Sequence, residues 1–275
     1  MFLVRLSDVV VCESESKGVA QLNSTASLEL DGKVALVTGG TRGIGRAIAV
    51  RLAGLGCDVH VCGRNAPDDL PAAIAFRAAD VRQPDQAIAL VDAIAGEAGR
   101  FDILINNAGG SPPCAAEAAS AGFVDAILKL NLVAPFTLAQ AAHKHMQGRG
   151  GSIVNIASVS GVRPSPGTAV YGAAKAGLLN LTQSLAQEWG RDAIRVNAII
   201  VGLATTETAE ATYGDAAAQA AVAASLPLGR MCEGRDVADA VAYLVSPLAQ
   251  YVSGARLNVD GGGERPYFLD LVKGG

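Results

Sequence analysis

The fold is decided by the stretch Lys33-Val-Ala-Leu-Val-Thr38, Gly39-Gly40-Thr41-Arg42-Gly43-Ile44-Gly45 and Arg46-Ala-Ile-Ala-Val-Arg-Leu-Ala-Gly-Leu55. Its first part is a short apolar run typical of a buried strand, and its last part has the period of an amphipathic helix. A glycine turn between the two lets the backbone approach a ligand closely, and the unpaired N–H groups at the helix start attract an anion. The stretch therefore predicts a pyrophosphate site, because the flanking strand and helix argue against a merely flexible turn.

Apolar runs and helical periods alternate along the rest of the chain, which favours a parallel sheet with helices on both faces. Strands are predicted at 33–38, 58–62, 74–79, 102–106, 152–157, 194–199 and 256–259. Helices are predicted at 43–55, 84–98, about 119–146, 169–189 and 234–246. Because Pro67 and Pro71 fall between the second and third strands, a helix there should be stunted. The pattern indicates a single-domain, Rossmann-like, doubly wound α/β sheet of about seven strands.

Ligands of such sheets bind outside the carboxyl ends of the strands. The chemically distinctive positions at or just past predicted strand ends are Thr38, Gly63, Asp80, Asn106, Ser158 and Val201. They should therefore gather at one edge of the sheet.

A tyrosine and a lysine stand four residues apart in Tyr171-Gly-Ala-Ala-Lys175, and Ser158 lies thirteen residues upstream of the tyrosine. Residues at this spacing share one face of a helix, so the phenol and the ammonium can point into one cleft. An ammonium beside a tyrosine stabilises the phenolate and is expected to lower the tyrosine pKa toward the working range. The pair alone is weak evidence, because helices carry such pairs by chance.

The motifs that stand in order along the chain are Thr38-Gly-x-x-x-Gly-x-Gly45, Asn106-Asn-Ala-Gly109, Asn131, Ser158 and Tyr171-x-x-x-Lys175. Together they resemble the short-chain dehydrogenase/reductase family, in its branch of roughly 250-residue keto-reductases and alcohol dehydrogenases. The resemblance runs from about Leu30 to Gly263.

The resemblance implies catalytic roles for Asn131, Ser158, Tyr171 and Lys175. Tyr171 is the general acid in reduction and the general base in oxidation, Lys175 also binds the nicotinamide ribose, and Ser158 orients the carbonyl oxygen. Asn131 lies in the middle of a predicted helix, where asparagine is unfavourable. Its counterpart in the family holds a water that links the lysine to solvent, whereas a merely exposed asparagine is the alternative.

The resemblance also implies a set of residues that contact NAD(P)(H). They are Gly39, Thr41, Arg42, Gly43, Ile44, Gly45, Gly63, Arg64, Asp80, Val81, Asn107, Ala108, Gly109, Tyr171, Lys175, Gly202 and Thr206. Relatives that prefer NAD carry an acidic residue near Gly63, which is missing here, while Arg42 and Arg64 suit a 2′-phosphate. We therefore expect NADP(H) to be preferred, with NAD(H) also possible. Asp80 either contacts the adenine or caps the helix that starts near Pro84.

One position departs from the family pattern. Val201-Gly202 stands where the family usually has Pro-Gly, so the lid that begins there, about 203–226, can take another course. Thr206 still matches the family threonine that contacts the nicotinamide amide. The lid holds Tyr213 among many alanines and identifies no substrate.

Composition excludes several functions. The net charge of −4 and the pI of about 5.4 come without a basic stripe, so no nucleic-acid partner is expected. No uninterrupted apolar run reaches the roughly 18–20 residues of a membrane span. The 5 cysteines lack Cys-x-x-Cys spacing and indicate a reduced cytoplasmic protein. His143 and His145 lack a third ligand, so no metal is expected.

The two chain ends do not fit the domain pattern. Residues 1–28 are expected to be a disordered leader or translation from an upstream start codon, leaving 29–275 as the NAD(P)-binding oxidoreductase domain. Beyond Gly263, we expect Tyr267, Phe268 and Leu269 to pack at a subunit boundary, with a solvated tail as the alternative. The alanine- and leucine-rich helices 119–146 and 169–189 should pair with their copies, which gives a homotetramer or a homodimer.

The function expected is an oxidoreductase that interconverts a secondary alcohol and a ketone by hydride transfer. Alternatives are a hydroxysteroid or 3-hydroxyacyl thioester dehydrogenase that runs oxidatively with NAD, or a non-catalytic cofactor-binding sensor. The sensor is disfavoured because Tyr171 and Lys175 are both present. An epimerase or dehydratase of the longer branch would need a larger C-terminal region, and enoyl-reducing relatives usually have a wider tyrosine-to-lysine spacing. The substrate and the direction stay open.

Overall fold

The protein folds into a seven-stranded parallel sheet with the strand order β3-β2-β1-β4-β5-β6-β7. This computed structural model describes residues 28–275 apart from 208, 267, 269–271 and 273–275. From β1 the chain adds β2 and β3 on one side of the sheet. It then crosses over, so that β4 pairs with the other side of β1. The predicted doubly wound sheet is confirmed, and the crossover places the switch point between β1 and β4.

The strands are β1 Val34–Thr38, β2 Asp58–Gly63, β3 Ile74–Ala78, β4 Ile103–Asn106, β5 Gly151–Ser158, β6 Ile194–Val201 and β7 Arg256–Val259. The α-helices are α1 Gly43–Ala53, α2 Pro84–Ala98, α3 Ala121–Leu128, α4 Ala134–Met146, α5 Ala169–Trp189, α6 Ala209–Tyr213, α7 Ala216–Ser225 and α8 Gly234–Val245. A π-helical turn, η2 Lys129–Val133, joins α3 to α4.

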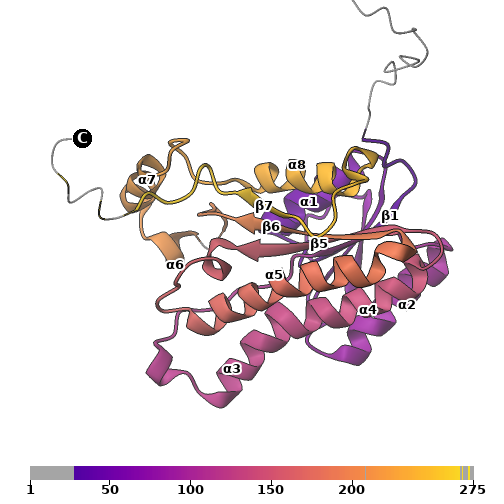
Figure 1. The fold of residues 1–275 in the computed structure, drawn as a ribbon, viewed down its shortest axis with the longest axis horizontal. Coiled ribbons are helices and arrows are strands. Elements are labelled where there is room, and N and C mark those ends of the chain that lie inside the picture. The colour runs from indigo at the N-terminus through magenta and orange to yellow at the C-terminus, as the bar shows by residue number, and fades with distance from the viewer. Residues whose placement is uncertain (1–27, 208, 267, 269–271, 273–275) are drawn as a thin grey trace, which may run out of the picture.

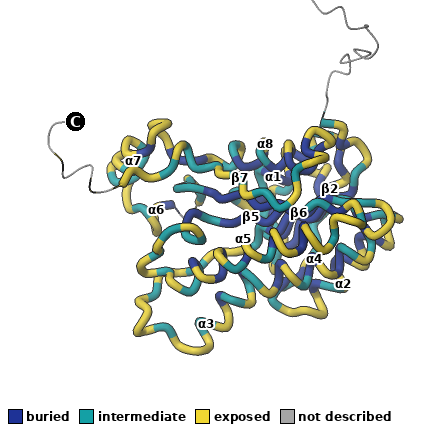
Figure 2. Tube along the Cα trace, viewed as in Figure 1, coloured by how far each residue is buried: buried dark blue, intermediate teal, exposed yellow. Residues whose placement is uncertain are grey.

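Helices cover both faces of the sheet (Figure 1). On one face α1 packs beside α8, where buried residues of both helices join a cluster with β1 and β2. On the other face α2, α4 and α5 pack over β4 and β5. The strands between these layers form the buried centre of the molecule (Figure 2). Because both faces are covered, β1 and β4 are buried along their whole length, as their continuous apolar runs require.

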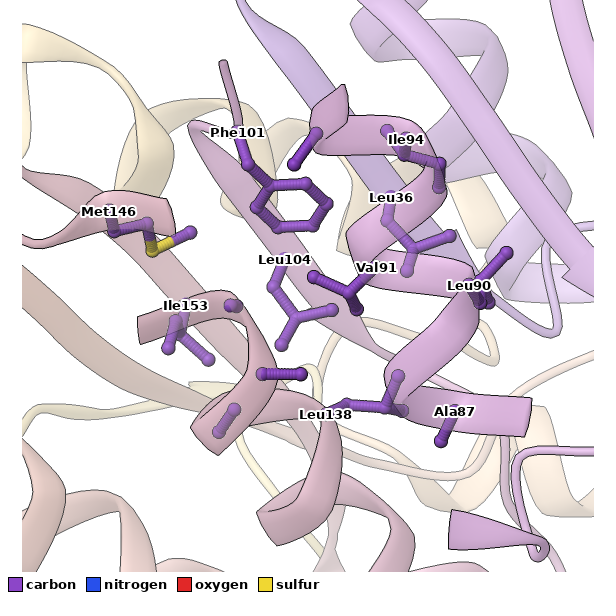
Figure 3. Packing of buried hydrophobic residues seen from close by; sticks show 14 of the residues in the cluster. Leu36, Ala87, Leu90, Val91, Ile94, Phe101, Leu104, Leu138, Met146 and Ile153 are labelled. Carbon is purple, nitrogen blue, oxygen red and sulfur yellow. The ribbon is translucent and has the colours of Figure 1, made fainter. Parts of the chain in front are cut away.

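The face under α2 and α4 is packed around Phe101, whose ring is 1% exposed. Its neighbours in the close-up come from different elements: Ile94 from α2, Leu104 from β4 and Met146 from the end of α4 (Figure 3). With only 4% aromatic residues in the chain, branched aliphatic side chains and alanines fill most of the remaining core. The small side chains let the helices lie close to the sheet.

The helix predicted at 119–146 is interrupted, which corrects the expectation of one continuous helix. It consists of α3, the π-helical turn η2 and α4, and Pro135 follows at the start of α4. Proline has no N–H to donate to the preceding turn, so the regular bonding pattern cannot continue through it. The extra residue of the π-helical turn carries Asn131 into the interior.

Two other segments complete the comparison with the sequence. The connection between β2 and β3 shows turns and no helix among its residues, in keeping with the two prolines. By length and apolar composition alone, the run Ala121–Met146 is sufficient to cross a membrane, a test that core helices of soluble proteins also pass. The leader predicted at 1–28 lies almost wholly outside the described residues, as do Tyr267 and Leu269.

Candidate active site

The glycine turn between β1 and α1 is shaped by contacts that a side chain would prevent. Gly39 and Gly43 adopt φ angles of 63° and 54°, which favour glycine. A Cβ at Gly40 would lie 2.5 Å from Val61 of β2, and a Cβ at Gly45 would lie 2.4 Å from the Asn107 side chain. The turn is therefore pressed against both neighbouring strands, with the first N–H groups of α1 at its mouth.

The Thr38 hydroxyl joins this turn to the segment after β4. It donates to the carbonyl of Ile105 at 3.2 Å and accepts from the N–H groups of Asn107 at 3.0 Å and Ala108 at 2.9 Å. The Asn107 amide in turn donates to the Thr38 carbonyl at 2.9 Å. Thr38 is 1% exposed, so these bonds are shielded from water. One side chain thus fixes the two loops that flank the switch point.

The predicted catalytic side chains meet at the carboxyl ends of β4 and β5. Tyr171 and Lys175 stand on α5, and the Lys175 Nζ lies 5.6 Å from the centre of the Tyr171 ring. Ser158 ends β5 and hydrogen-bonds to the Tyr171 hydroxyl. The Lys175 Nζ donates to the carbonyl of Ile156, in the same strand, at 2.7 Å. Strand and helix thereby present hydroxyl, phenol and ammonium together.

The structure does not show the expected lowering of the Tyr171 pKa by Lys175. Burial raises the pKa of Tyr171, and the hydrogen bond from Ser158 only partly opposes this rise. Burial also lowers the pKa of Lys175 to about 8, so its charge is costly where it lies. The sequence argument overlooked this desolvation, because four-residue spacing says nothing about how deep both groups sit.

Asn131 is 0% exposed, which rules out the merely exposed asparagine. Its amide nitrogen donates to the carbonyls of Gly110 and Ile127 at 3.0 Å each, and its oxygen accepts from the Gly110 N–H at 2.9 Å. A Cβ added to Gly109 would lie 2.8 Å from the Asn131 Oδ1 and 3.1 Å from the Lys175 Nζ. Asn131 therefore ties the π-helical turn to the loop after β4, next to the lysine.

A cleft of about 930 Å³ runs along this edge of the sheet. Each residue predicted to contact the cofactor lines it, from Gly39 in the glycine turn to Thr206 in the lid, and so do Ser158, Tyr171 and Lys175. Asn131 lies behind the cleft wall and does not line it. Val201, in place of the usual proline, ends β6 in regular pairing with Ser158 and Val259.

The structure adds residues that sequence reasoning missed. Arg82 binds the Asp80 carboxylate at 2.6 Å and holds the pKa of Asp80 below its usual range. Asp80 does not cap α2, because its oxygens are turned to Arg82, and the N-cap of α2 is Gln83. Neither Asp80 nor Arg82 belongs to a spacing pattern that reveals this pair.

A buried amide network under the site was also missed. The Asn106 side chain donates to the Asn155 Oδ1 at 2.9 Å, and the Asn155 side chain donates to the Thr182 hydroxyl at 2.9 Å. These residues lie on β4, β5 and α5, so the network fixes the helix that carries Tyr171 against the strands. A signal was present: polar residues inside apolar strands point to a buried partner.

The residues at the far end of the cleft are rich in hydroxyl groups. Its lining there includes Ser111, Ser160, Ser165, Thr168 and Tyr213. Arg163 also lines it and forms an ion pair with Glu264, whose oxygen lies 2.7 Å from the guanidinium. The part of the chain after Gly263 is thus tied to the rim of the cleft through Glu264.

The cleft fits a nicotinamide dinucleotide. The close approach at Gly40 and Gly45, the left-handed φ at Gly43 and the N–H groups at the start of α1 form a cradle for a pyrophosphate. Arg42, Arg64 and Arg82 line the adenosine end, and Tyr171 and Lys175 the other end. No cluster of potential metal ligands occurs among the residues that the structure describes.

His143 and His145, predicted not to bind metal, each contact a carboxylate. The His143 ring lies 2.8 Å from Asp192, and the His145 ring lies 2.7 Å from Asp92. Both histidines stand in the last turn of α4, where a helix favours positive charge.

Cys57, Cys62 and Cys232 are buried free thiols, and burial raises the pKa of each.

Comparisons with known proteins show which family the chain is similar to. A sequence model of a family described as "Enoyl-(Acyl carrier protein) reductase" matches residues 39–264. A tropinone reductase homologue of Arabidopsis thaliana is 36% identical over 268 residues, which are 93% of this chain and 83% of that protein. A 3-oxoacyl-acyl-carrier-protein reductase of Vibrio cholerae is 36% identical over 86% of this chain and 98% of that protein.

Among solved structures, the aldohexose dehydrogenase of Thermoplasma acidophilum superposes with a TM-score of 0.80. It is 32% identical, and the match covers 85% of this chain and 94% of that one. The similarity in fold therefore extends over most of the chain.

The buried lysine gives a test of the site's electrostatics in the ligand-free protein. Burial lowers the pKa of Lys175 from 10.5 to about 8, so between these values the unfolded chain binds this proton more tightly than the folded one. Stability should therefore rise with pH in that window. We expect the wild type to gain about 2–3 kcal/mol relative to Lys175→Met between about pH 7 and about pH 10.

Urea unfolding at several pH values measures this difference, and Lys144→Met serves as the control for losing an exposed lysine on α4. A difference between wild type and Lys175→Met that does not change with pH would contradict the cost assigned to burying the ammonium.

Proposed function

The chain belongs to the short-chain dehydrogenase/reductase family, and from this premise we propose that Tyr171, Lys175, Ser158 and Asn131 make it an oxidoreductase that interconverts a secondary alcohol and a ketone. Family membership makes it an oxidoreductase acting on CH–OH groups with NAD(P)(H). The observation that carries the proposal is the meeting of the Tyr171 hydroxyl, Ser158 and buried Lys175 in the cleft that the glycine turn also lines.

The nicotinamide, when bound, supplies or accepts the hydride. In reduction, Tyr171 gives its phenolic proton to the carbonyl oxygen while Ser158 holds that oxygen by a hydrogen bond. The phenolate left behind lies next to the Lys175 ammonium, which favours the charged form at that moment. In oxidation the same phenolate takes the proton of the alcohol.

Asn131 supports this proton transfer from behind the cleft. Its Oδ1 accepts one hydrogen bond, from Gly110, and keeps a second lone pair. A water held there lies next to Lys175, since both groups approach Gly109. After reduction, the Tyr171 phenolate regains a proton from Lys175, and Lys175 takes one in turn from this water without opening the cleft.

The hydroxyl-rich far end of the cleft favours a small polar ketone or alcohol over a steroid. The Ser165 hydroxyl bonds to those of Ser160 at 3.1 Å and Thr168 at 2.6 Å, and a hydroxyl oxygen has a second lone pair that a polar substrate can use. A non-catalytic sensor has no need for the buried Lys175, which costs stability at neutral pH.

Replacing Tyr171 tests the proton transfer. Tyr171→Phe removes the acid but little volume, and we expect kcat to fall at least about 100-fold, the scale of general acid catalysis. The assay follows nicotinamide absorbance with a panel of hydroxylated ketones, apolar ketones and the matching alcohols. Tyr213→Phe, the same change at another tyrosine of the cleft, should cost far less. Turnover within a few-fold of wild type for Tyr171→Phe would reject the role.

We propose that NADP(H) is the preferred cofactor. Arg42, Arg64 and Arg82 surround the adenosine end of the cleft, and Gly63 replaces the acidic residue that would repel a 2′-phosphate. The carboxylate of Asp80 is already paired with Arg82, so it opposes the phosphate less. Guanidinium groups bind phosphate by charge-assisted hydrogen bonds.

The test is kcat/KM with each cofactor. We expect Arg64→Ala to lower kcat/KM with NADPH by about 10- to 100-fold and to change that with NADH little, since only NADPH carries the 2′-phosphate. Arg191→Ala, an exposed arginine in the turn after α5, controls for the loss of one positive charge. A wild type that favours NADH rejects the proposal.

We also propose that the protein assembles through α4 and α5, since members of its family often form oligomers. The side chains of Val133 and Phe136 are 45% and 38% exposed at the start of α4, which leaves apolar area in contact with water. The apolar run 121–146 is only 28% buried over its most apolar window, as expected for helices that pair with a second copy.

Light scattering measures the assembly directly. The full-length protein should have the mass of a dimer or a tetramer, and Phe136→Glu should dissociate it, because the charge would be buried at the interface.

Truncation after Gly263 removes Glu264 and its ion pair with Arg163, so we expect altered KM. A monomeric wild type rejects assembly, and unchanged size and kinetics after truncation reject a role for the tail.

A further inference from the structure

A carboxylate of the protein occupies part of the pyrophosphate cradle. The N–H of Gly43, the first residue of α1, donates to the Glu207 Oε1 at 2.9 Å. The second oxygen of the same carboxylate would lie 3.2 Å from a Cβ at Gly43. Glu207 belongs to the lid, shortly before α6, and is 164 residues away from Gly43 in the chain. The contact therefore bridges the lid and the glycine turn.

The surroundings hold Glu207 ionised. Hydrogen bonds from its own backbone N–H and from that of Gly43 lower its pKa, and the charges of Arg42 and Arg46 lower it further. A negative charge at the first N–H group of a helix is the arrangement by which helices bind phosphate. The Glu207 carboxylate has the chemistry of a phosphate oxygen in the place where one is expected.

We propose that Glu207 competes with the cofactor's pyrophosphate for the start of α1 and so sets the affinity for the cofactor; this rests on the proposed function. The Gly43 N–H makes one strong hydrogen bond to an anion at a time, and a pyrophosphate beside the Glu207 carboxylate repels it. Cofactor binding must therefore expel Glu207, and the energy of the lost contact is subtracted from the binding energy.

The expelled side chain has a place to go. Glu207 stands between the main cleft and an open hollow of about 390 Å³ between α1 and α8, and it lines both. The hollow is also lined by Arg235, which is 73% exposed and forms an ion pair with Glu233 at 3.0 Å. A turn of Glu207 into this hollow keeps its charge in water near a guanidinium.

Movement of Glu207 also affects the substrate end. Thr206, next to it, lines the cleft, and so does Tyr213, at which α6 ends. When the pyrophosphate expels Glu207, the segment that carries Thr206 and Tyr213 is released from α1. The lid is thereby coupled to the cofactor.

An ordinary helix cap is the competing explanation, and it predicts the opposite result. If Glu207 only stabilised the start of α1, its loss would lower the melting temperature and leave cofactor affinity unchanged or weaker. Competition predicts tighter binding of the cofactor on loss of the same carboxylate.

The experiment is titration of the full-length protein with NADPH and NADH, followed by fluorescence. We expect Glu207→Gln to lower Kd about three- to tenfold, because an exposed carboxylate at a helix start is held only modestly. Glu207→Asp keeps the charge but is one methylene too short for the contact, so it should show part of the gain. Glu210→Gln, an exposed glutamate on α6, should bind like wild type.

The outcomes separate the inference from the proposed function. A wild type that binds neither cofactor rejects both, whereas a wild type that binds, with Glu207→Gln unchanged or weaker, rejects the inference alone. If Glu207→Asp bound the cofactor with the Kd of wild type, any tighter binding by Glu207→Gln would come from the lost charge and not from the lost contact with Gly43. That result would overturn the competition.

Hydrogen exchange tests the coupling to the lid. Without cofactor, the amides of α6 should exchange faster in Glu207→Gln than in wild type, because the tether to Gly43 is lost. With saturating NADPH the two proteins should exchange alike, since the cofactor has already expelled Glu207 from wild type. Equal exchange without cofactor would overturn the coupling.

Discussion

The buried hydrogen bonds from Asn106 through Asn155 to Thr182 hold the active site in register. Ser158 ends a strand and Tyr171 stands on the following helix, so their contact depends on how α5 lies along β5. Apolar packing alone allows a helix to slide over a sheet, whereas a buried amide left without its partner costs free energy. The network therefore permits one position of α5 and so one position of the tyrosine.

The second constraint concerns the hydrogen-bond donors and positive charges that line the cleft, because carboxylates of the protein itself bind some of them. The N–H groups at the start of α1 favour an anion, and the Gly43 N–H donates to the Glu207 carboxylate. The Arg163 guanidinium at the far end of the cleft forms an ion pair with Glu264. Both carboxylates are exposed, so each contact stabilises the protein only modestly, and its loss would subtract from the binding energy of a ligand that replaced it. The lid and the C-terminal segment are the elements that supply them.

The sequence predicted what depends on short spacing. Period and turn residues placed the strands, and parallel strands bring their carboxyl ends to one edge, so Ser158, Tyr171 and Gly43 could be assigned to one cleft. Two contacts could not be predicted: the ion pair of Arg82 with nearby Asp80, which turns the Asp80 carboxylate away from α2, and the bond from Gly43 to Glu207, 164 residues away. Nothing in local composition says which carboxylate reaches which donor.

The sequence also did not show how deeply Tyr171 and Lys175 are buried, and this burial determines the direction of their pKa shifts. The four-residue spacing correctly placed Lys175 beside Tyr171, but burial raises the pKa of the phenol and lowers that of the ammonium. Both shifts favour the neutral forms of the two side chains. In the proposed mechanism, a phenolate formed during proton transfer is stabilised by the ammonium within the same poorly solvated space, where their attraction is strongest. Under this proposal, the burial that opposes charge at rest strengthens the pair when a proton moves, and Asn131 holds the water that restores the proton.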